Sequence, residues 1–397
     1  MPERPISVRR RVAVTGLGVV SACGIGREAF WDGLLAEPPE GLRRVDDFDP
    51  SPFYANPKEV RRADRFEQFS TAAAAEAVAQ SGLPTGDPVR MGVIVGTGIG
   101  GLQTIEDQTI VRYEKGPRRV SPFLIPMVMG NAPAAAVSMR YGFQGPCENV
   151  VTACAAGTHS VANAARLISS GRCTAVIAGS TEAAMTETGV AGFTNMTAMS
   201  SSLTSRPFDA RRDGFVMSEG AGMLVLEEWD SAVARGATIL AEVLGGASTA
   251  DAHHITAPAP DGSGAIACIE LALEEAGLSP SDIVQVNAHG TSTPLNDAAE
   301  ATAINKVFGA PGPAVTSIKG VIGHALGAAG SIEAVAVVLS MQKALIPPTA
   351  GYGTPDPEMA PIDIVAGAAR PWTPGPTLSN SFGFGGHNGC VIFAPPS

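Results

Sequence analysis

The chain has 397 residues, 45% of them hydrophobic, so it can bury a core large enough for two or three domain-sized units. It carries 27 Lys and Arg against 38 Asp and Glu, and this net charge of -11 argues against broad binding to nucleic acid or membrane surfaces. Six cysteines without a CxxC pair argue against a structural metal cluster, and no apolar run reaches transmembrane length. We therefore expect a cytoplasmic protein with reduced thiols.

Residues 12–20 form an apolar run interrupted by Gly16 and Gly18, which predicts a buried strand followed by a turn. This Gly-Leu-Gly opening resembles the start of a dinucleotide-binding fingerprint. However, Gly24 and Gly26 miss its spacing, and no acidic residue ends a second strand at the expected distance. We therefore do not expect a nucleotide site here.

Strands and helices alternate along the chain, which is typical of an α/β fold whose sheets are covered by helices. A second cycle begins near residue 239, so we expect an N-terminal half at residues 1–238 and a C-terminal half at residues 239–397. Each half has a junction of small residues leading into a helix, which is consistent with a duplicated unit. The predicted helices are residues 63–81, 161–168, 263–276, 297–307 and 327–344, and the later strands are residues 91–98, 173–179, 222–227, 239–245, 283–287, 376–380 and 389–393.

Residues 149–160 predict a buried strand that ends at Cys154 and turns directly into a helix. At a helix start, unpaired N–H groups and the positive end of the macrodipole stabilise a thiolate. Small neighbouring residues leave room for a substrate to approach the sulfur. The alternative is a buried structural cysteine, which behaves as a small hydrophobic residue.

Two histidines, His289 and His324, also stand beside glycines near the ends of apolar segments, where side chains can face a crevice. A thiolate can attack a thioester and carry its acyl group. Two imidazoles can then hydrogen-bond the carbonyl oxygen of a second thioester and stabilise the enolate that loss of CO₂ leaves. A glycine-rich loop at residues 379–388 would allow close approach, and its Phe382 and Phe384 would shield an intermediate from water. The alternative for this loop is a flexible turn between the last two strands.

With these residues the chain resembles the elongating β-ketoacyl-[acyl-carrier-protein] synthases of the thiolase superfamily, most closely the synthase II-like condensing enzymes. The resemblance covers nearly the whole chain. It implies the thiolase fold, with two similar α/β halves forming a layered αβαβα core. It also implies decarboxylative Claisen condensation of a Cys-bound acyl group with malonyl-[acyl-carrier-protein], without an organic cofactor. The matching stretches are residues 152–157, 206–209, 212–216, 287–294, 319–330 and 380–386.

The resemblance also implies a role for each matching residue. Cys154 would be the nucleophile, and His289 and His324 the decarboxylation pair. Lys319 matches an active-site lysine, and Phe384 matches a gating phenylalanine whose N–H completes the oxyanion hole. The implied substrate-binding residues are Thr291, Thr293, Thr256, Ile99, Phe193 and Phe382. Some members hold a structural cation, and its ligands would here be Asn287, Glu333, Ser379 and Asn380.

The implied partners are acyl carrier protein, in its acyl and malonyl forms, and a second copy of the chain in a homodimer. Related polyketide systems instead form a heterodimer with a chain-length partner. The carrier protein of this family is acidic, so local basic residues would steer it despite the net negative charge. A solvated face is the more common role of a charge run. The implied docking residues are Arg61, Arg62, Arg65, Arg118 and Arg119.

Fatty-acid elongation is the favoured pathway, and a type II polyketide or polyene ketosynthase is the alternative. Residues 194–205 form a shorter segment than in typical fatty-acid members, and His387 stands where a small polar residue is common. Residues 127–132 are unusual for a region that shapes the acyl pocket. A coenzyme A thiolase is disfavoured because the glycine-rich loop lacks a second cysteine base. A non-catalytic partner subunit is disfavoured because Cys154 and both histidines are present.

Overall fold

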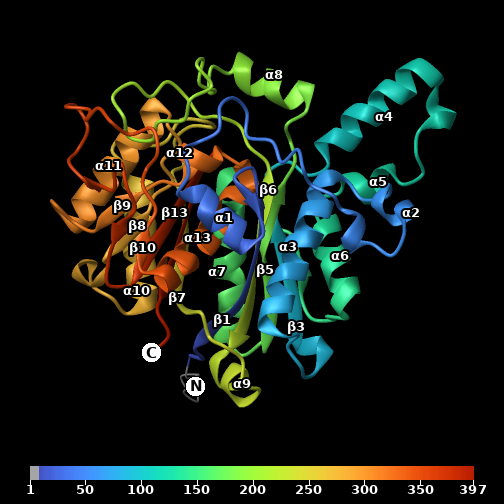
Figure 1. Cartoon of the computed structure of the whole chain (residues 1–397), viewed down its shortest axis with the longest axis horizontal. Coiled ribbons are helices and arrows are strands. Elements are labelled where there is room, and N and C mark those ends of the chain that lie inside the picture. Colours follow the sequence, from blue (N-terminus) through green and yellow to red (C-terminus); the bar gives the residue numbers. More distant parts are fainter. Residues whose placement is uncertain (1–8) are drawn as a thin grey trace, which may run out of the picture.

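The computed structural model describes residues 9–397, and most of its strands form one mixed sheet of 12 strands (Figure 1). The strands are β1 Val12–Ser21, β2 Gly24–Ile25, β3 Met91–Gly96, β4 Cys147–Glu148, β5 Ala175–Glu182, β6 Gly220–Glu228, β7 Ala241–Ala250, β8 Gln285–Asn287, β9 Ala314–Thr316, β10 Leu345–Ile346, β11 Asp363–Ile364, β12 Arg370–Pro371, β13 Thr377–Gly383 and β14 His387–Ala394. Their order is β11-β9-β8-β13-β14-β7-β1-β6-β5-β3-β4, with β2 paired to β1 off this path and β10 paired to β12 separately.

The helices form three layers that alternate with the strands of the two halves. They are α1 Arg27–Leu34, α2 Pro57–Val60, α3 Arg65–Ser81, α4 Leu102–Lys115, α5 Leu124–Val128, α6 Ala132–Tyr141, α7 Ala156–Ser169, α8 Glu187–Asn195, α9 Trp229–Ala234, α10 Ser263–Ala276, α11 Pro294–Phe308, α12 Lys319–Ile322 and α13 Ala329–Lys343.

The contacts between helices and strands define the layers. Helix α3 covers β1, β5 and β6 on one outer face, and α6 lies against β3. Helices α7 and α13 are central: α7 contacts β3, β5 and β6 on one side and β7 and β14 on the other, while α13 contacts β6 and β13. Helix α10 covers β7 and β14 on the second outer face, with α11 beside it. The structure thus has the expected layered αβαβα arrangement, with α4 and α5 projecting to the right in Figure 1.

Close packing of α3 on the sheet explains the glycines of the first strand. A Cβ on Gly18 would lie 1.9 Å from the carbonyl oxygen of Ala73, and one on Gly16 would lie 2.1 Å from that of Ala77. Only glycine allows a helix backbone to approach a strand this closely. The Gly-Leu-Gly sequence therefore serves the contact between helix and sheet. The predicted turn is wrong, because β1 continues to Ser21 with only a register shift between Val14 and Gly16.

The buried strand predicted to end at Cys154 is wrong. The chain forms only the two-residue β4 at the sheet edge, where it pairs with Val93 and Ile94 of β3, and both of its residues are exposed. Residues 149–152 then leave the strand, and Val151 is 56% exposed. An edge position supplies a neighbour on one side only, so an apolar run there does not become a buried strand.

The two halves share the sheet through β1 and β7, whose residues Val12–Val14 pair with Ala241–Val243. The predicted boundary after residue 238 falls in the segment between α9 and β7. Strand β6 is antiparallel to both β1 and β5. Over the residues that the structure describes, no helix combines the length and apolar character needed to cross a membrane.

Candidate active site

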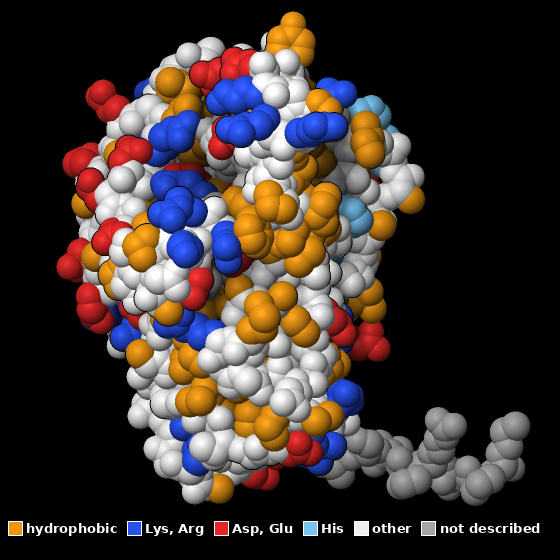
Figure 2. All heavy atoms as spheres, turned by 90° about the vertical axis from the view of Figure 1, so that its right-hand side faces the viewer, with side chains coloured by type: hydrophobic (Ala, Val, Ile, Leu, Met, Phe, Trp, Pro, Cys, Tyr) orange, Lys and Arg blue, Asp and Glu red, His pale blue; other side chains and the backbone are white. Residues whose placement is uncertain are grey.

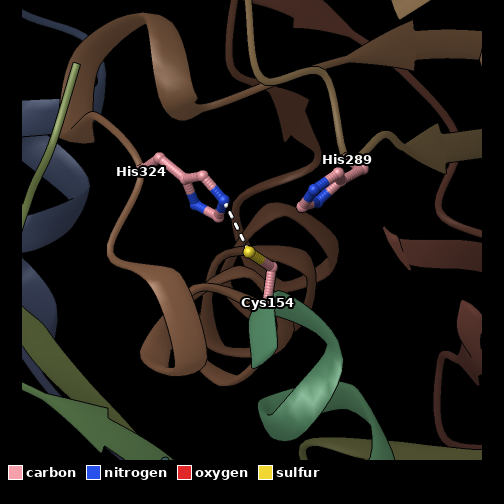
Figure 3. Close-up of side chains that lie close together, drawn as sticks. All are labelled: Cys154, His289 and His324. Carbon is pink, nitrogen blue, oxygen red and sulfur yellow. Dashed lines mark hydrogen bonds between the residues drawn. The ribbon is translucent and has the colours of Figure 1, made fainter. Parts of the chain in front are cut away.

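Three reactive side chains from distant parts of the chain meet in Figure 3. Cys154 lies in a 3₁₀ turn, Ala153–Ala155, immediately before α7, while His289 follows β8 and His324 follows α12. The Nε2 atom of His324 lies 3.1 Å from the Cys154 Sγ, and the two imidazole centroids are 5.3 Å apart. The sulfur and one nitrogen of each ring all lie within 4.8 Å of one another. The structure therefore brings together the three residues that the sequence singled out.

Backbone N–H groups surround the Cys154 sulfur because glycines let the glycine-rich loop come close. A Cβ on Gly383 would lie 3.0 Å from the Cys154 nitrogen, a contact that the neighbouring backbone could not relieve easily. The backbone N–H groups of Cys154 and Phe384 lie near enough to the sulfur to lower the pKa of its thiol. Two donors therefore stand where an oxyanion would form beside a Cys-bound carbonyl.

Burial decides the protonation state of Cys154. The side chain is 9% exposed. Desolvation raises the pKa of its thiol to about 12, although the positive charge of Lys319 and two N–H groups lower that pKa. Burial therefore opposes the thiolate that the helix start was expected to favour. Burial also holds the pKa of His324 well below its usual range, so its neutral Nε2 can accept the thiol hydrogen.

We expect the alkylation rate of Cys154 by iodoacetamide to keep rising with pH up to about pH 10, because only the thiolate is nucleophilic and the thiol pKa is about 12. Mass spectrometry of the Cys154 peptide after timed labelling measures this rate. The exposed Cys147 of the same chain serves as an internal control for the reagent. A rate that has reached its plateau by about pH 7 would contradict a protonated resting thiol.

His289 lies beside a fully buried ion pair between Lys319 and Glu333. The Lys319 Nζ donates to the backbone oxygen of His289 at 2.6 Å and lies 3.4 Å from its Nδ1. Burial, followed by the charges of Lys319 and His324, holds the pKa of His289 well below its usual range. A neutral ring whose Nδ1 faces an ammonium group accepts there and carries its proton on Nε2. His289 is therefore prepared to donate from Nε2.

Two buried carboxylates that the sequence analysis missed hold the loop that carries His289. Glu300 of α11 accepts hydrogen bonds from the N–H groups of His289 and Gly290, each at 2.7 Å. Asp297, one turn earlier on the same helix, accepts from the next two N–H groups of the loop. The available signal was a pair of acidic residues three positions apart in a helix that opens with Thr-Pro beside this loop.

His159, one turn into α7, is a further residue to which the sequence assigned no role. Its Nδ1 lies 2.8 Å from the Thr152 hydroxyl, and its Nε2 lies 3.0 Å from the carbonyl oxygen of Asn388. Burial lowers the pKa of His159, so the ring is neutral, donates from Nε2 and accepts at Nδ1. His159 therefore braces the segment before Cys154 against the strand that follows the glycine-rich loop.

A cavity of about 380 Å³ connects Cys154 to the surface. The ring centroid of Phe193 lies 5.5 Å from that of Phe215 and 6.5 Å from that of Phe384, so aromatic rings form one wall. Ile99 does not line this cavity and is 42% exposed. The other predicted substrate-binding residues all line it: Thr256, Thr291, Thr293, Phe193 and Phe382.

The residues predicted to hold a cation lie close to one another. The side-chain amide of Asn287 donates to the Ser379 hydroxyl at 3.1 Å. Glu333 Oε1 pairs with Lys319, and its buried Oε2 has no partner in hydrogen-bond geometry among the described residues. A free carboxylate oxygen fits a hard cation, which prefers oxygen ligands. Cation binding stays a prediction.

The predicted docking arginines do not all occupy the same environment. Arg61, Arg62, Arg118 and Arg119 are exposed, and the Arg62 guanidinium lies 4.1 Å from the ring centroid of Phe123. Figure 2 shows Lys and Arg side chains beside an apolar patch on this face.

Arg65 is different, and its prediction as a docking residue needs correction. Its guanidinium pairs with the buried Glu219 at 2.8 Å and donates to the Val45 carbonyl. Releasing Arg65 would leave a buried carboxylate without its partner. Arg65 therefore has a structural role.

The chain matches family models along most of its length. Residues 38–232 match the model described as beta-ketoacyl synthase, N-terminal domain, and residues 240–353 match the corresponding C-terminal domain. The chain is 43% identical over 410 residues to a 3-oxoacyl-[acyl-carrier-protein] synthase 2 of Synechocystis sp., covering 97% of this chain and 98% of the relative. It is 41% identical over 411 residues to a Staphylococcus aureus protein of the same name, covering 98% and 99%.

Solved structures with the same fold are also similar over their full length. The structure described as the ishigamide ketosynthase/chain length factor has a TM-score of 0.92 at 33% identity, covering 98% of this chain and 100% of that chain. In a second structure, AntDE:AntF, a type II polyketide synthase carrier protein is in complex with its ketosynthase bound to the hexaketide. It has a TM-score of 0.90 at 31% identity, with the same coverage.

Proposed function

Because the chain belongs to the β-ketoacyl synthase family, we propose that the cavity around Cys154, His289 and His324 is its active site. The protein condenses an acyl group with malonyl-[acyl-carrier-protein] and releases CO₂ and β-ketoacyl-[acyl-carrier-protein], the carbon–carbon bond-forming step of fatty-acid elongation. The observation that carries the site assignment is the 3.1 Å approach of the His324 Nε2 to the Cys154 Sγ.

The first step is acyl transfer to Cys154. The thiol hydrogen passes to the Nε2 of His324, and the sulfur attacks the carbonyl carbon of the acyl thioester. The N–H groups of Cys154 and Phe384 donate to the oxygen of the tetrahedral intermediate. Collapse breaks the thioester bond of the carrier, whose departing thiolate takes the proton from His324. The acyl group is then bound to Cys154.

The second step is decarboxylation of the malonyl group. The Nε2–H groups of His289 and His324 donate to the malonyl thioester oxygen, and the bond to the carboxylate breaks with release of CO₂. The electron pair of that bond becomes an enolate. Lys319 contributes by holding the Nδ1 of His289 unprotonated, which keeps the donor hydrogen on Nε2.

The third step forms the carbon–carbon bond. The enolate carbon attacks the acyl carbonyl on Cys154, and the same two N–H groups stabilise the second oxyanion. Collapse releases the β-ketoacyl product and the Cys154 thiolate, which takes a proton from solvent to restore the thiol.

His324 has to accept a hydrogen at Nε2 in the first step and donate one from Nε2 in the second. Its buried Nδ1 has no hydrogen-bond partner among the residues that the structure describes. Neither tautomer is therefore fixed by a protein contact, in contrast to His289. Between the two steps the ring releases its Nδ1 proton and takes one at Nε2 by exchange with water in the cavity, so that one ring serves both steps.

The test of this function is reconstitution with purified acyl- and malonyl-carrier protein. We expect a β-ketoacyl product two carbons longer than the acyl substrate, with one CO₂ released for each product. Mass spectrometry of the carrier measures the product, and trapped Cys154 should carry the acyl group before malonyl substrate is added. Transfer of the acyl group to Cys154 without any condensation product would contradict the proposed function.

Polyketide or polyene synthesis is the second candidate, and the likeness to the ishigamide and AntDE:AntF ketosynthases favours it. A panel of carrier-bound saturated, polyene and β-keto acyl chains separates the two pathways. Elongation of saturated chains supports fatty-acid synthesis. Acceptance of polyene or β-keto chains alone would support the second candidate.

The exposed arginines near Phe123 are proposed to dock the acidic carrier protein. Replacing Arg61 and Arg62 with Glu should raise the KM for both carrier-bound substrates about 10-fold at low salt and leave kcat unchanged, because opposite charges steer association. Steady-state kinetics at two salt concentrations measure this effect. Reversal of the exposed Arg172, remote from these residues in the sequence, is the matched control. Unchanged kinetics at both salt concentrations would contradict the docking role.

We also propose a homodimer through the face in Figure 2. Exposed apolar side chains gather on neighbouring elements of this region, including Ile105 and Tyr113 of α4, Ile125 of α5 and Met139 of α6. Exposed apolar surface of this kind marks interaction sites. Sedimentation should give twice the 40.4 kDa of one chain, and a monomer would contradict the proposal.

A heterodimer would require a chain-length partner. The cytoplasmic location stays a prediction.

A further inference from the structure

A fourth buried acidic residue, Glu182, lies close to the active site but takes no part in the steps above. It is the last residue of β5, and its side chain is fully buried. Among the described residues its carboxylate pairs with no cation and instead accepts from the Thr97 hydroxyl at 3.0 Å and the N–H groups of Gly98 at 2.7 Å and Gly327 at 3.1 Å. Burying a charge without a cation is costly, so these contacts have to stabilise it.

The donors to Glu182 come from both halves of the protein. Thr97 and Gly98 directly follow β3, whereas Gly327 lies in the 3₁₀ turn Leu326–Ala328 that separates His324 from α13. A Cβ on Gly327 would lie 2.1 Å from the nitrogen of Gly98, so the two backbones are in direct contact. Hydrogen bonds to the Glu182 carboxylate therefore connect the turn after His324 to the end of β3.

On each side of the contact between Thr97, Gly98 and Gly327, a reacting residue lies close by along the chain or through one hydrogen bond. The N–H of Thr97 donates to the carbonyl oxygen of Val150 at 3.1 Å, and Val150 lies four residues before Cys154. On the other side, Leu326 is two residues after His324, has a φ of 48° and lines the cavity. A change in the contacts of Glu182 would therefore move Cys154 and His324 relative to each other.

We propose that Glu182 is a positioning residue for condensation, which holds Cys154 and His324 at reacting distance by tying Thr97 and Gly98 to Gly327. The proposal rests on the proposed function of the Cys154 site. Glu182 does not line the cavity and meets no substrate, so it acts only through the segments that it joins. A misplacement of about 1 Å in such a pair costs about 100-fold in rate.

Two substitutions separate the contacts of Glu182 from its charge. A Gln side chain can accept from both glycine N–H groups with its carbonyl oxygen and donate to the Thr97 hydroxyl with its amide. Glu182→Gln thus keeps the connection and removes the charge, as protonation would, whereas Glu182→Ala removes both. Burial raises the pKa of Glu182 to about 7, so the neutral form is also accessible to the wild-type protein.

The experiment measures kcat and KM for condensation with carrier-bound substrates. We expect Glu182→Ala to lower kcat about 100-fold with KM changed less than about twofold, and Glu182→Gln to keep kcat within about threefold. Glu227→Ala is the matched control, because Glu227 is also a buried carboxylate but lies at the far end of β6, where it pairs with Arg235. That variant should lower the melting temperature without lowering kcat.

Wild-type kcat in Glu182→Ala would overturn the proposal, and so would equal losses in the Ala and Gln variants. If Glu182→Ala does not fold, Thr97→Val removes one donor at nearly constant shape and should lower kcat about fivefold, and an unchanged kcat would overturn the proposal. A wild-type protein that forms no condensation product would contradict the proposed function instead. The two failures are therefore distinguishable.

Discussion

Cys154→Ala should lower kcat for condensation by at least about 10⁴-fold, because no other group can form the acyl-enzyme. Slow release of CO₂ from malonyl-[acyl-carrier-protein] should persist in this variant, since His289 and His324 remain in place to stabilise the enolate. Product formation and CO₂ release have to be measured in the same reaction. Their ratio, near one in the wild type, should fall towards zero.

Cys147→Ala is the matched control for this experiment, because Cys147 is the exposed cysteine of β4 and lies outside the cavity. It should condense at the wild-type rate. Normal condensation by Cys154→Ala would overturn the assignment of the nucleophile. Loss of both product and CO₂ would show that Cys154 also supports decarboxylation, contrary to the division of roles proposed above.

Substitution of the two histidines should separate the two half-reactions. His289→Ala and His324→Ala should each lower decarboxylation about 10²–10³-fold, the usual cost of removing one donor to a developing oxyanion. Only His324→Ala should also slow acyl transfer to Cys154, by about 10²-fold, because only His324 contacts the sulfur. Rapid-quench measurement of acylated Cys154 and trapping of released CO₂ follow the two steps independently.

Equal losses of acyl transfer in both histidine variants would contradict the dual role of His324. The distinction rests on orientation. The Nδ1 of His289 faces the Lys319 ammonium group, whereas the Nε2 of His324 faces the thiol. Lys319 therefore fixes one tautomer, and the other ring stays free to change.

Much of the site could be predicted from the chain alone. Cys154, His289 and His324 each stand in a glycine- or alanine-rich stretch at the end of a segment, and these patterns depend on residues that are neighbours in the sequence. The alternation of strands and helices likewise predicted the α/β class and most of the long elements. The local pattern failed at β4, because an edge position depends on which strands lie beside it.

The environment of each group could not be predicted in this way. Cys154 and His324 are 170 residues apart, so their 3.1 Å contact exists only after the two halves have come together. The same association buries the sulfur, and this burial raises the pKa of the Cys154 thiol, against the expectation from the helix start. In the sequence, Arg65 is one of a run of basic residues. Only the fold shows that it pairs with Glu219, which is 154 positions away.

Glu182 and Glu300 show the same division. A pair of acidic residues in one helix was the signal for Glu300, whereas nothing near Glu182 in the sequence marks it. The role of each follows from the backbone N–H groups that other segments bring to it. The reactive groups of the protein, and the glycine- or alanine-rich stretch in which each one stands, follow from the sequence alone. Only the tertiary structure decided their distances, protonation states and partners, because desolvation and hydrogen bonding depend on segments that are far apart along the chain.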